Sequence, residues 1–394
     1  MGRPKINLGS KNIAIVTHRS IMPCIPGDDL KRFLLTHNCK SLLYIKHPLL
    51  LLKESYKLHS EVEHYNGNSP VKTSKAPRVI LPESGHYIKD FLYTTYWILK
   101  SRNTYDLYFG INNLNALAGL VLKKLGKVNK VIYYTIDLYP ERFSNTFINW
   151  IYHKLDKLCV ANCDETWNVS PFMKRFRAEN GIPETGHSRQ FTVPIGVWLN
   201  QRNIIPLNRI KKTKLVFIGH LVAFRGVDLA IKALPIIAKT IPDVTLEIVG
   251  GGEQLEYLKQ LAQKLQVNQM IKFHGFVESN KTALNIISNS AIALAPYRTK
   301  NNPPAKNADP AKIKEYLSLG IPVITTKAPS IAKEIQKARC SMVVNFSTES
   351  FADAVIKLLS NRKLWKEYRK NALQYVKQFD WNIIFSKNIS RLLG

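Results

Sequence analysis

The residues best suited to chemistry stand together between Asp309 and Glu315, where the chain reads Asp-Pro-Ala-Lys-Ile-Lys-Glu. Asp309 can cap a helix that begins at Pro310, and the unpaired N–H groups of a first helical turn suit an anionic diphosphate. Lys312 and Glu315 share one side of this helix, so one can reach a phosphate while the other accepts hydrogen bonds from a ribose. An ordinary surface Lys–Glu pair is the alternative, and this stretch alone leaves both readings open.

A second group of residues follows the ends of predicted strands or opens a predicted helix. A glycine after a strand lets the backbone approach a bulky ligand, and a basic residue at a helix start can hold a phosphate. An aromatic ring in such a place can border a flat base. Flexible turns and packed side chains remain alternatives for each residue taken alone. The members of this group are Gly219, His220, Arg225, Gly250, Gly251 and Phe276.

In the first half of the chain, Asp137 is the clearest candidate. It follows the predicted strand 131–134, and ligands of parallel sheets bind at the carboxyl ends of the strands. Its carboxylate could hydrogen-bond a substrate hydroxyl. A helix cap or an ion pair with Arg142 explains the residue equally well.

These residues must be positioned by short apolar runs that alternate with longer amphipathic segments. Near-continuous apolar strands separated by helices predict parallel sheets covered on both faces. The pattern restarts at Leu215 after the polar, basic link 201–214, so we expect an α/β protein with two doubly wound domains, 1–200 and 201–378, facing a cleft. In the first domain the predicted strands are 14–17, 42–45, 107–109, 131–134 and 166–169.

Composition narrows the possible partners. The 394 residues include 57 Lys and Arg against 28 Asp and Glu, a formal net charge of +29, which attracts nucleic acid, anionic lipid or phosphorylated substrates. The basic residues are scattered, whereas a nucleic-acid binder needs a basic stripe interleaved with exposed aromatic residues. We therefore expect no nucleic acid, although a basic nucleic-acid- or membrane-binding protein remains an alternative. The segment Tyr87–Lys100 could dock on a membrane or be a core helix.

The expected location is the cytoplasm, with any membrane contact peripheral and on the inner face of the plasma membrane. The five cysteines form no C-x-x-C pair, and their odd number argues against a disulfide framework. The chain begins with polar and basic residues that run into a strand, so we expect no signal peptide. The apolar stretch 42–52 is too short for a membrane span.

The order of the motifs in the second half is more specific than any of them alone. Gly219 and Arg225 come first, then Gly250-Gly251-Gly252, His274-Gly275-Phe276 and finally the stretch 310–324. This succession over 215–382 resembles the nucleotide-sugar domain of GT-B glycosyltransferases, specifically the family-four retaining group (group 1 type). The ending Phe379-Asp380-Trp381 also resembles that family, in which the last helix, here 379–394, crosses back to the first domain.

The resemblance implies an activity and its partners. We expect a retaining hexosyltransferase that moves a sugar from a nucleotide-sugar donor to a lipid-linked or glycan acceptor in cell-envelope glycan synthesis, at an anionic membrane surface. No cofactor and no metal are implied, and the leaving diphosphate helps to deprotonate the acceptor. A sugar-nucleotide epimerase on the same scaffold is the alternative enzyme.

The resemblance also implies roles for individual residues. Arg225 stands where the family usually has a lysine on the donor diphosphate, and Glu315 matches the second glutamate of a pair that binds the ribose. Asn307 occupies the place of the first glutamate of that pair. His220 occupies a place where the family often has an arginine, and Lys312 can supply the cation that is missing there. The implied catalytic residues are Asp137, Arg225 and Lys312. The implied donor-binding residues are Gly27, Gly219, His220, Arg225, Gly250, Gly251, Phe276, Pro310, Lys312, Ile313 and Glu315.

Overall fold

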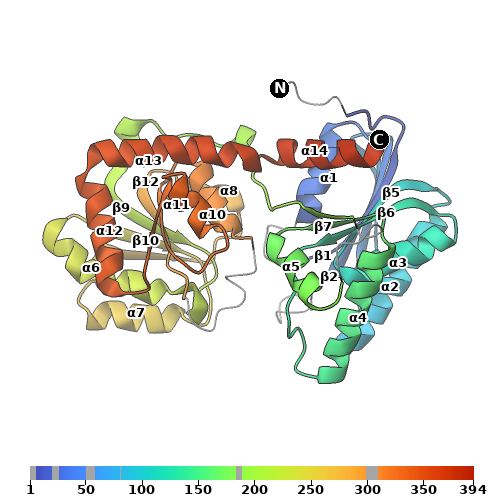
Figure 1. The fold of residues 1–394 in the computed structure, drawn as a ribbon, viewed down its shortest axis with the longest axis horizontal. Coiled ribbons are helices and arrows are strands. Elements are labelled where there is room, and N and C mark those ends of the chain that lie inside the picture. The colour runs from blue at the N-terminus through green and yellow to red at the C-terminus, as the bar shows by residue number, and fades with distance from the viewer. Residues whose placement is uncertain (1–5, 20–25, 50–57, 80, 183–188, 299–308) are drawn as a thin grey trace. The chain divides into compact units, whose positions relative to one another are not determined.

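The computed structural model describes residues 6–19, 26–49, 58–79, 81–182, 189–298 and 309–394. The chain divides into two compact units, which are described separately (Figure 1). Unit 1 comprises Met1–Pro194 with Asn382–Gly394, and unit 2 comprises Ile195–Trp381.

Unit 1 contains an eight-stranded sheet in the order β4-β3-β2-β1-β5-β6-β7-β8. Six neighbouring strands of this sheet pair in parallel, namely β2, β1, β5, β6, β7 and β8. Their apolar runs are buried, as is typical of parallel strands that are covered on both faces. The strands are β1 (Asn12–Arg19), β2 (Ser41–Pro48), β3 (Glu61–Asn66), β4 (Ser69–Lys75), β5 (Tyr105–Ile111), β6 (Val128–Thr135), β7 (Glu165–Asn168) and β8 (Gln190–Thr192).

The antiparallel hairpin β3–β4 at the edge of this sheet was not among the predicted strands. Its turn contains Gly67, whose φ of +55° suits glycine. β4 reads Ser-Pro-Val-Lys-Thr-Ser-Lys and is almost wholly exposed, so it lacks the apolar run that identifies a strand. The sheet is therefore mixed at one edge, and the predicted α/β class is confirmed.

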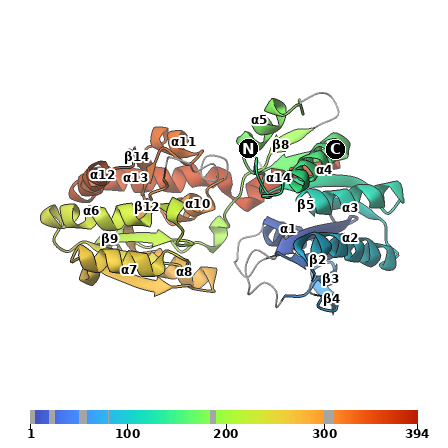
Figure 2. The ribbon, with the colours of Figure 1, turned by 90° about the horizontal axis from the view of Figure 1, so that it is seen from below.

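Six α-helices complete the described part of unit 1. α3 contacts both α2 and α4 and packs on β5 and β6, so the three form one layer on the sheet (Figures 1 and 2). α1 and α14 meet through the rings of Phe33 and Phe385, whose centroids are 5.4 Å apart. The helices are α1 (Pro26–Thr36), α2 (Glu83–Lys100), α3 (Asn113–Lys124), α4 (Thr146–Asn162), α5 (Pro171–Glu179) and α14 (Trp381–Leu393).

Unit 2 contains a six-stranded parallel sheet in the order β11-β10-β9-β12-β13-β14. Its core joins strand residues such as Phe217, Ile248 and Leu294 to helix residues such as Ile231 and Val355. The strands are β9 (Lys211–Ile218), β10 (Thr245–Val249), β11 (Ile271–Gly275), β12 (Ser290–Ala295), β13 (Val323–Thr326) and β14 (Ser341–Val344). The α-helices described are α6 (Val227–Thr240), α7 (Leu255–Lys264), α8 (Asn280–Ile287), α10 (Ala311–Ser318), α11 (Ala332–Lys337), α12 (Thr348–Ser360) and α13 (Arg362–Tyr375).

The start of unit 2 differs from the boundary expected after residue 200, because Ile195 is held by Lys314 of α10 and by Asp309, two residues before that helix. Asp309 Oδ2 accepts a hydrogen bond from the Ile195 N–H at 2.6 Å, and Lys314 Nζ donates to the Ile195 carbonyl at 2.7 Å. Asp309 also pairs with Lys314. The prediction that Asp309 caps the helix is therefore wrong: the N-cap position is Pro310, without a side-chain cap.

The final helix joins unit 1 through its C-terminal half. Arg391 pairs with Glu165 of β7 at 2.7 Å, and Lys130 Nζ of β6 donates to the Leu392 carbonyl at 2.7 Å. Because these contacts lie within unit 1, residues 382–394 are part of it. The expected last segment started three residues earlier, at Phe379.

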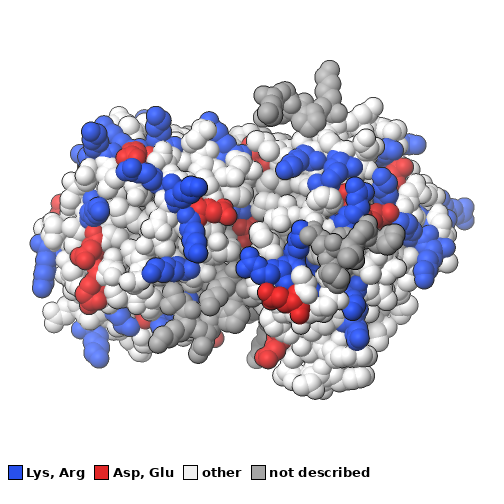
Figure 3. All heavy atoms as spheres, in the orientation of Figure 1, with Lys and Arg blue, Asp and Glu red and all other residues white. Residues whose placement is uncertain are grey.

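Basic side chains are spread over the faces of both units that Figure 3 shows, with acidic side chains among them. The cysteines in the described ranges, Cys39, Cys159, Cys163 and Cys340, are buried and unpaired. None of the helices in the described ranges combines the length and apolar character needed to cross a membrane.

Candidate functional site

The carboxyl ends of β9, β10 and β11 are closed by glycines that approach one another closely. The Gly219 N–H donates to the Val249 carbonyl at 2.9 Å, and the Gly250 N–H donates to the Gly275 carbonyl at 2.8 Å. Gly250 has a φ of +149°, and a Cβ atom there would lie 2.0 Å from the Gly219 carbonyl oxygen. Flexibility alone does not explain these glycines, because the contact leaves no room for a side chain.

His220, Gly251 and Phe276 extend the same edge. A Cβ atom at Gly251 would lie 3.5 Å from Phe276 Cβ, and one at Gly252 would lie 2.5 Å from His220 Cδ2. Half of the Phe276 side chain is exposed, so its ring is accessible beside the glycines. The structure thus brings these residues together, as the motif order predicted.

Two cations converge on the ring of Tyr297. Arg225 Nη1 donates to the Tyr297 hydroxyl at 2.9 Å, and the guanidinium carbon lies 5.2 Å from the ring centroid. Lys312 Nζ lies 5.4 Å from the same centroid and 4.1 Å from that of Phe217. A Cβ atom at Gly219 would be 2.9 Å from Lys312 Nζ. The lysine therefore lies directly over the glycines at the carboxyl ends of β9 and β10, which we call the glycine edge.

Neither cation has a counterion among the described residues. Lys312 Nζ and Arg225 Nε are buried and make no hydrogen bond to the part of the chain that the structure describes. Burial, and after it the charge of Arg225, holds the pKa of Lys312 well below its usual value. Two neighbouring buried cations are favourable only when an anion joins them, and a diphosphate at a glycine-lined strand end provides that charge.

Tyr297 was not among the predicted site residues. The signal that could have found it is its place two residues after β12, the strand next to β9, where a side chain reaches the same edge of the sheet. Its position between Arg225 and Lys312 makes it the residue that aligns the two cations.

Glu315 has a partner that sequence reasoning missed. Its Oε2 atom accepts a hydrogen bond from Arg202 Nη2, and the two side chains form an ion pair. Burial raises the pKa of Glu315, against the opposing effect of Arg202. The expected ribose acceptor is therefore already bound on one oxygen. Arg202 lies in the polar link, more than a hundred positions away, so no local spacing points to it.

Two further predicted donor-binding residues are buried in unit 2. Ile313 is fully buried, and its N–H donates to the Pro310 carbonyl at 3.0 Å. Pro310 is buried as well. The first turn of α10 is thus less open to an anion than expected, whereas the Lys312 side chain lies over the glycines. Asn307 lies outside the described residues.

Gly27 and Asp137 lie in unit 1. Gly27 is in the first turn of α1, and a Cβ atom there would lie 2.8 Å from Ile111 Cδ1, so a larger residue would require the Ile111 side chain to move. Asp137 is exposed after β6, and its Oδ1 atom accepts a long hydrogen bond of 3.4 Å from the Tyr139 hydroxyl. Although the residue is exposed, desolvation of its carboxyl group raises the pKa of Asp137, against the opposing effect of Arg142.

A buried polar cluster at the carboxyl ends of β1 and β2 was not anticipated. Asp90 lies 3.2 Å from His18 Nε2 and 3.3 Å from His47 Nδ1, and burial lowers the pKa of His47. Asn115 Nδ2 lies 3.1 Å from the other ring nitrogen of His18, and the Thr94 hydroxyl 2.8 Å from His47 Nε2. All four ring nitrogens are therefore engaged, which indicates a structural role.

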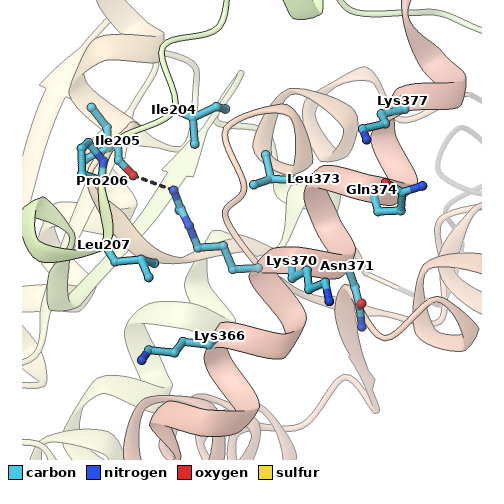
Figure 4. A pocket seen from close by; sticks show the side chains of 11 residues that line it. Ile204, Ile205, Pro206, Leu207, Lys366, Lys370, Asn371, Leu373, Gln374 and Lys377 are labelled. Atoms are coloured by element: carbon cyan, nitrogen blue, oxygen red, sulfur yellow. Dashed lines mark hydrogen bonds between the residues drawn. The ribbon is translucent and has the colours of Figure 1, made fainter.

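The hollow in Figure 4 is separate from these residues. It has a volume of about 640 Å³ and lies between residues 204–207 and α13 of unit 2. Arg369 donates to the Ile205 carbonyl at 2.7 Å, the contact drawn in the figure, and to the Gly320 carbonyl at 3.1 Å. Arg369 thereby ties the link and the end of α10 to α13, and the hollow contains none of the predicted site residues.

Known proteins resemble parts of this chain in sequence. The family described as "Glycosyl transferases group 1" matches residues 201–375. The GDP-mannose-dependent alpha-(1-6)-phosphatidylinositol monomannoside mannosyltransferase of Mycobacterium tuberculosis is 29% identical over 153 residues, which are 39% of this chain and 40% of that protein. The lipopolysaccharide glucosyltransferase WaaG of Escherichia coli is 27% identical over 218 residues, which are 55% and 54% of the two chains. The chain thus spans about two fifths to one half of the length of these relatives.

Solved structures resemble it over almost its whole length. Sucrose-phosphate synthase from Thermosynechococcus elongatus has a TM-score of 0.73 at 14% identity, over 97% of this chain and 98% of that one. Anabaena HepE in complex with UDP has a TM-score of 0.68 at 16% identity, over 96% and 99% of the two chains. At such identities the likeness shows the fold. The chain therefore has the GT-B fold, and its residues 201–375 match the glycosyl transferases of group 1.

Proposed function

We propose that this protein is a retaining glycosyltransferase that moves a hexose from a nucleotide-sugar donor to a lipid-linked or glycan acceptor in cell-envelope glycan synthesis. The observation that carries the proposal is the pair Arg225 and Lys312, two cations without a described counterion over the glycine edge of unit 2. The names of the relatives, a phosphatidylinositol mannoside mannosyltransferase and a lipopolysaccharide glucosyltransferase, support the acceptor class. We place the activity in the cytoplasm, peripheral to the inner face of the plasma membrane.

In this proposal the two cations stabilise the diphosphate as it leaves. Arg225 offers a planar fork of donors, and Lys312 a compact charge, so together they match the oxygens of a diphosphate. Gly219, Gly250 and Gly251 let the nucleotide approach the strand ends, and the exposed ring of Phe276 borders its base. No metal ion is needed for charge neutralisation, since side-chain cations supply the charge.

The remaining residues would act on the sugars. Glu315 binds the ribose hydroxyls, using the oxygen that is not bonded to Arg202, or exchanging Arg202 for the ribose. Gly27 contacts the donor diphosphate, and Asp137 hydrogen-bonds the donor sugar or the acceptor hydroxyl. With the diphosphate accepting the proton of the attacking hydroxyl, no separate general base is required.

The test of the function is donor binding followed by transfer. One relative is named for GDP-mannose, and HepE was solved with UDP, so both bases belong in the panel. We expect UDP- or GDP-sugars to raise the melting temperature of the protein, whereas single-stranded oligonucleotides leave it unchanged. Radiolabelled donors incubated with membrane extract then identify the sugar transferred. Stabilisation by oligonucleotides alone would overturn the proposal.

Binding of a nucleoside diphosphate is expected to take up a proton at Lys312. Its pKa is lowered in the free protein, and a bound diphosphate stabilises the charged form, so the pKa rises on binding. Affinity should therefore fall as the pH rises from the lowered pKa towards that of the complex. Calorimetry at about pH 8, well above the second phosphate pKa of about 6, in buffers of different ionisation enthalpy measures the uptake. Lys312→Met should abolish it; equal uptake by the wild type and the variant would contradict the role.

A further inference from the structure

The outward side of α4 carries large apolar side chains at helical spacing. Phe147, Trp150, Ile151 and Leu158 follow one another at intervals of three, one and seven residues, which places them on a single face. Their exposed fractions are 66%, 55%, 37% and 43%. The rings of Phe147 and Trp150 are nearly parallel, with centroids 6.0 Å apart. Such a stripe normally faces a core, yet here it faces outward.

α2 presents a second stripe of the same kind. Ile88, Leu92, Tyr96 and Leu99 recur every three or four residues, with exposed fractions of 63%, 60%, 51% and 41%. The sequence had left open whether this helix docks on a membrane or lies in the core. Trp97, stacked on Tyr93, packs inward and is 8% exposed, so the helix has both a core face and an outward apolar face.

The two stripes belong to one layer of unit 1. α3 contacts α2 on one side and α4 on the other, and the three helices lie side by side on the sheet (Figures 1 and 2). We call the eight exposed residues of the two stripes the α2–α4 face. These are eight of the seventeen large apolar residues that are exposed in the described ranges, and exposed apolar groups of this size mark interaction sites. The members are Ile88, Leu92, Tyr96, Leu99, Phe147, Trp150, Ile151 and Leu158.

The exposed charged side chains described on α2 and α4 are basic. Lys154 Nζ lies 5.4 Å from the Trp150 ring, and Lys100 Nζ lies 5.0 Å from the Tyr96 ring and donates to its hydroxyl at 2.8 Å. The carboxylates described on these helices, Asp90 and Asp156, are buried in ion pairs instead. Apolar and aromatic side chains flanked by exposed lysines, with no exposed carboxylate among the described side chains of these two helices, are complementary to an anionic phospholipid surface.

We propose that the α2–α4 face inserts into the interfacial region of an anionic phospholipid bilayer. Tryptophan and tyrosine favour the depth of the lipid headgroups, lysines reach the phosphates, and the aliphatic side chains enter the acyl boundary. This proposal says which surface contacts the membrane, and it rests on the part of the proposed function that makes the protein a peripheral membrane protein. Vesicle binding is measured without a sugar donor, so failure of binding and failure of transfer can be told apart.

The first test is flotation of the full chain with vesicles of phosphatidylcholine containing phosphatidylglycerol, against phosphatidylcholine alone. We expect binding to the anionic vesicles, and at least about tenfold weaker binding of a triple variant, Phe147→Ser, Trp150→Ser and Ile151→Ser. Val71→Ser is the matched control, because Val71 on β4 is equally exposed at 66% and lies in the same unit. The replaced side chains are exposed, so the melting temperature should not change.

A second variant separates charge from apolar contact. Lys154→Glu together with Lys157→Glu should weaken binding to anionic vesicles and leave the α2–α4 face otherwise intact, and added salt should weaken the wild type in the same direction. Equal binding of the triple variant and the wild type would overturn the proposal. So would self-association of the wild type without lipid that the triple variant loses, because the face would then join two copies of the chain.

Tryptophan fluorescence gives a direct readout of insertion. All six tryptophans lie in the described ranges, and Trp150 is 55% exposed, whereas the other five are at most 8% exposed. Quenching by aqueous iodide therefore reports on Trp150. We expect anionic vesicles to protect it from iodide and vesicles with brominated acyl chains to quench it. Trp150→Phe should remove both effects, and unchanged iodide quenching on vesicle binding would contradict insertion at this face.

Discussion

Replacement of Arg225 by alanine is expected to lower the rate of sugar transfer about 10²–10³-fold, the usual cost of removing one donor that stabilises a developing negative charge. Arg225 is aligned by the Tyr297 hydroxyl, and its buried Nε atom has no described partner. It is thus prepared for an anion before that anion arrives. Removal should leave the fold intact, because the guanidinium makes no described ion pair that the structure depends on.

Two further variants make this prediction specific. Arg225→Lys should keep most of the activity, because a lysine is usual at this place in the enzymes that the chain resembles, although the fork geometry is lost. Lys232→Ala removes a cation that pairs with Asp228 on α6 and should have little effect. The measurements are kcat/KM with the identified donor and the dissociation constant of the nucleoside diphosphate. Wild-type values for Arg225→Ala in both would contradict a role at the diphosphate.

The second large effect is expected for Arg177→Ala, which should lower the free energy of unfolding of unit 1 by about 3–5 kcal/mol. Arg177 is 1% exposed, and its Nε and Nη2 atoms donate to the two carboxylate oxygens of Asp156 at 2.8 and 2.6 Å. Tyr133 and Thr135 of β6 bond to the same pair. Removal of the guanidinium leaves the Asp156 carboxylate buried without its cation, which costs far more than the pair itself contributes.

Urea unfolding monitored by circular dichroism measures this loss. Arg339→Ala is the control, since its ion pair with Glu367 lies on the surface of unit 2, with side chains 57% and 41% exposed. A surface pair of this kind contributes about 0–1 kcal/mol. A loss for Arg177→Ala no larger than that of the control would show that the Asp156 carboxylate finds other donors or takes up a proton.

Local sequence determined much of this protein. Apolar runs with helices between them predicted parallel sheets, and the predicted strands 107–109 and 131–134 lie within β5 and β6. Gly320 follows the end of α10 with a φ of +68°, a conformation that glycine adopts readily at a helix end. These features depend on neighbours in the chain, namely on periodicity, φ preference and helix termination, so residue order is sufficient to predict them.

The motif order predicted which residues gather at the strand ends of unit 2, because the carboxyl ends of parallel strands share one edge. It could not place Tyr297 between Arg225 and Lys312, or bring Arg202 to Glu315, since such contacts depend on side-chain direction and on distant segments. The same reason applies to Asp309, which binds the Ile195 backbone instead of capping its own helix.

Exposure was likewise decided by tertiary structure alone. The apolar residues of α2 and α4 have the spacing of core positions, and only the packing of these helices around α3 shows which of them face outward. Sequence therefore determined the elements and the residue types at the strand ends. The three-dimensional packing determined which charges remain without partners and which apolar side chains meet solvent, because both depend on what lies on the other side of each group.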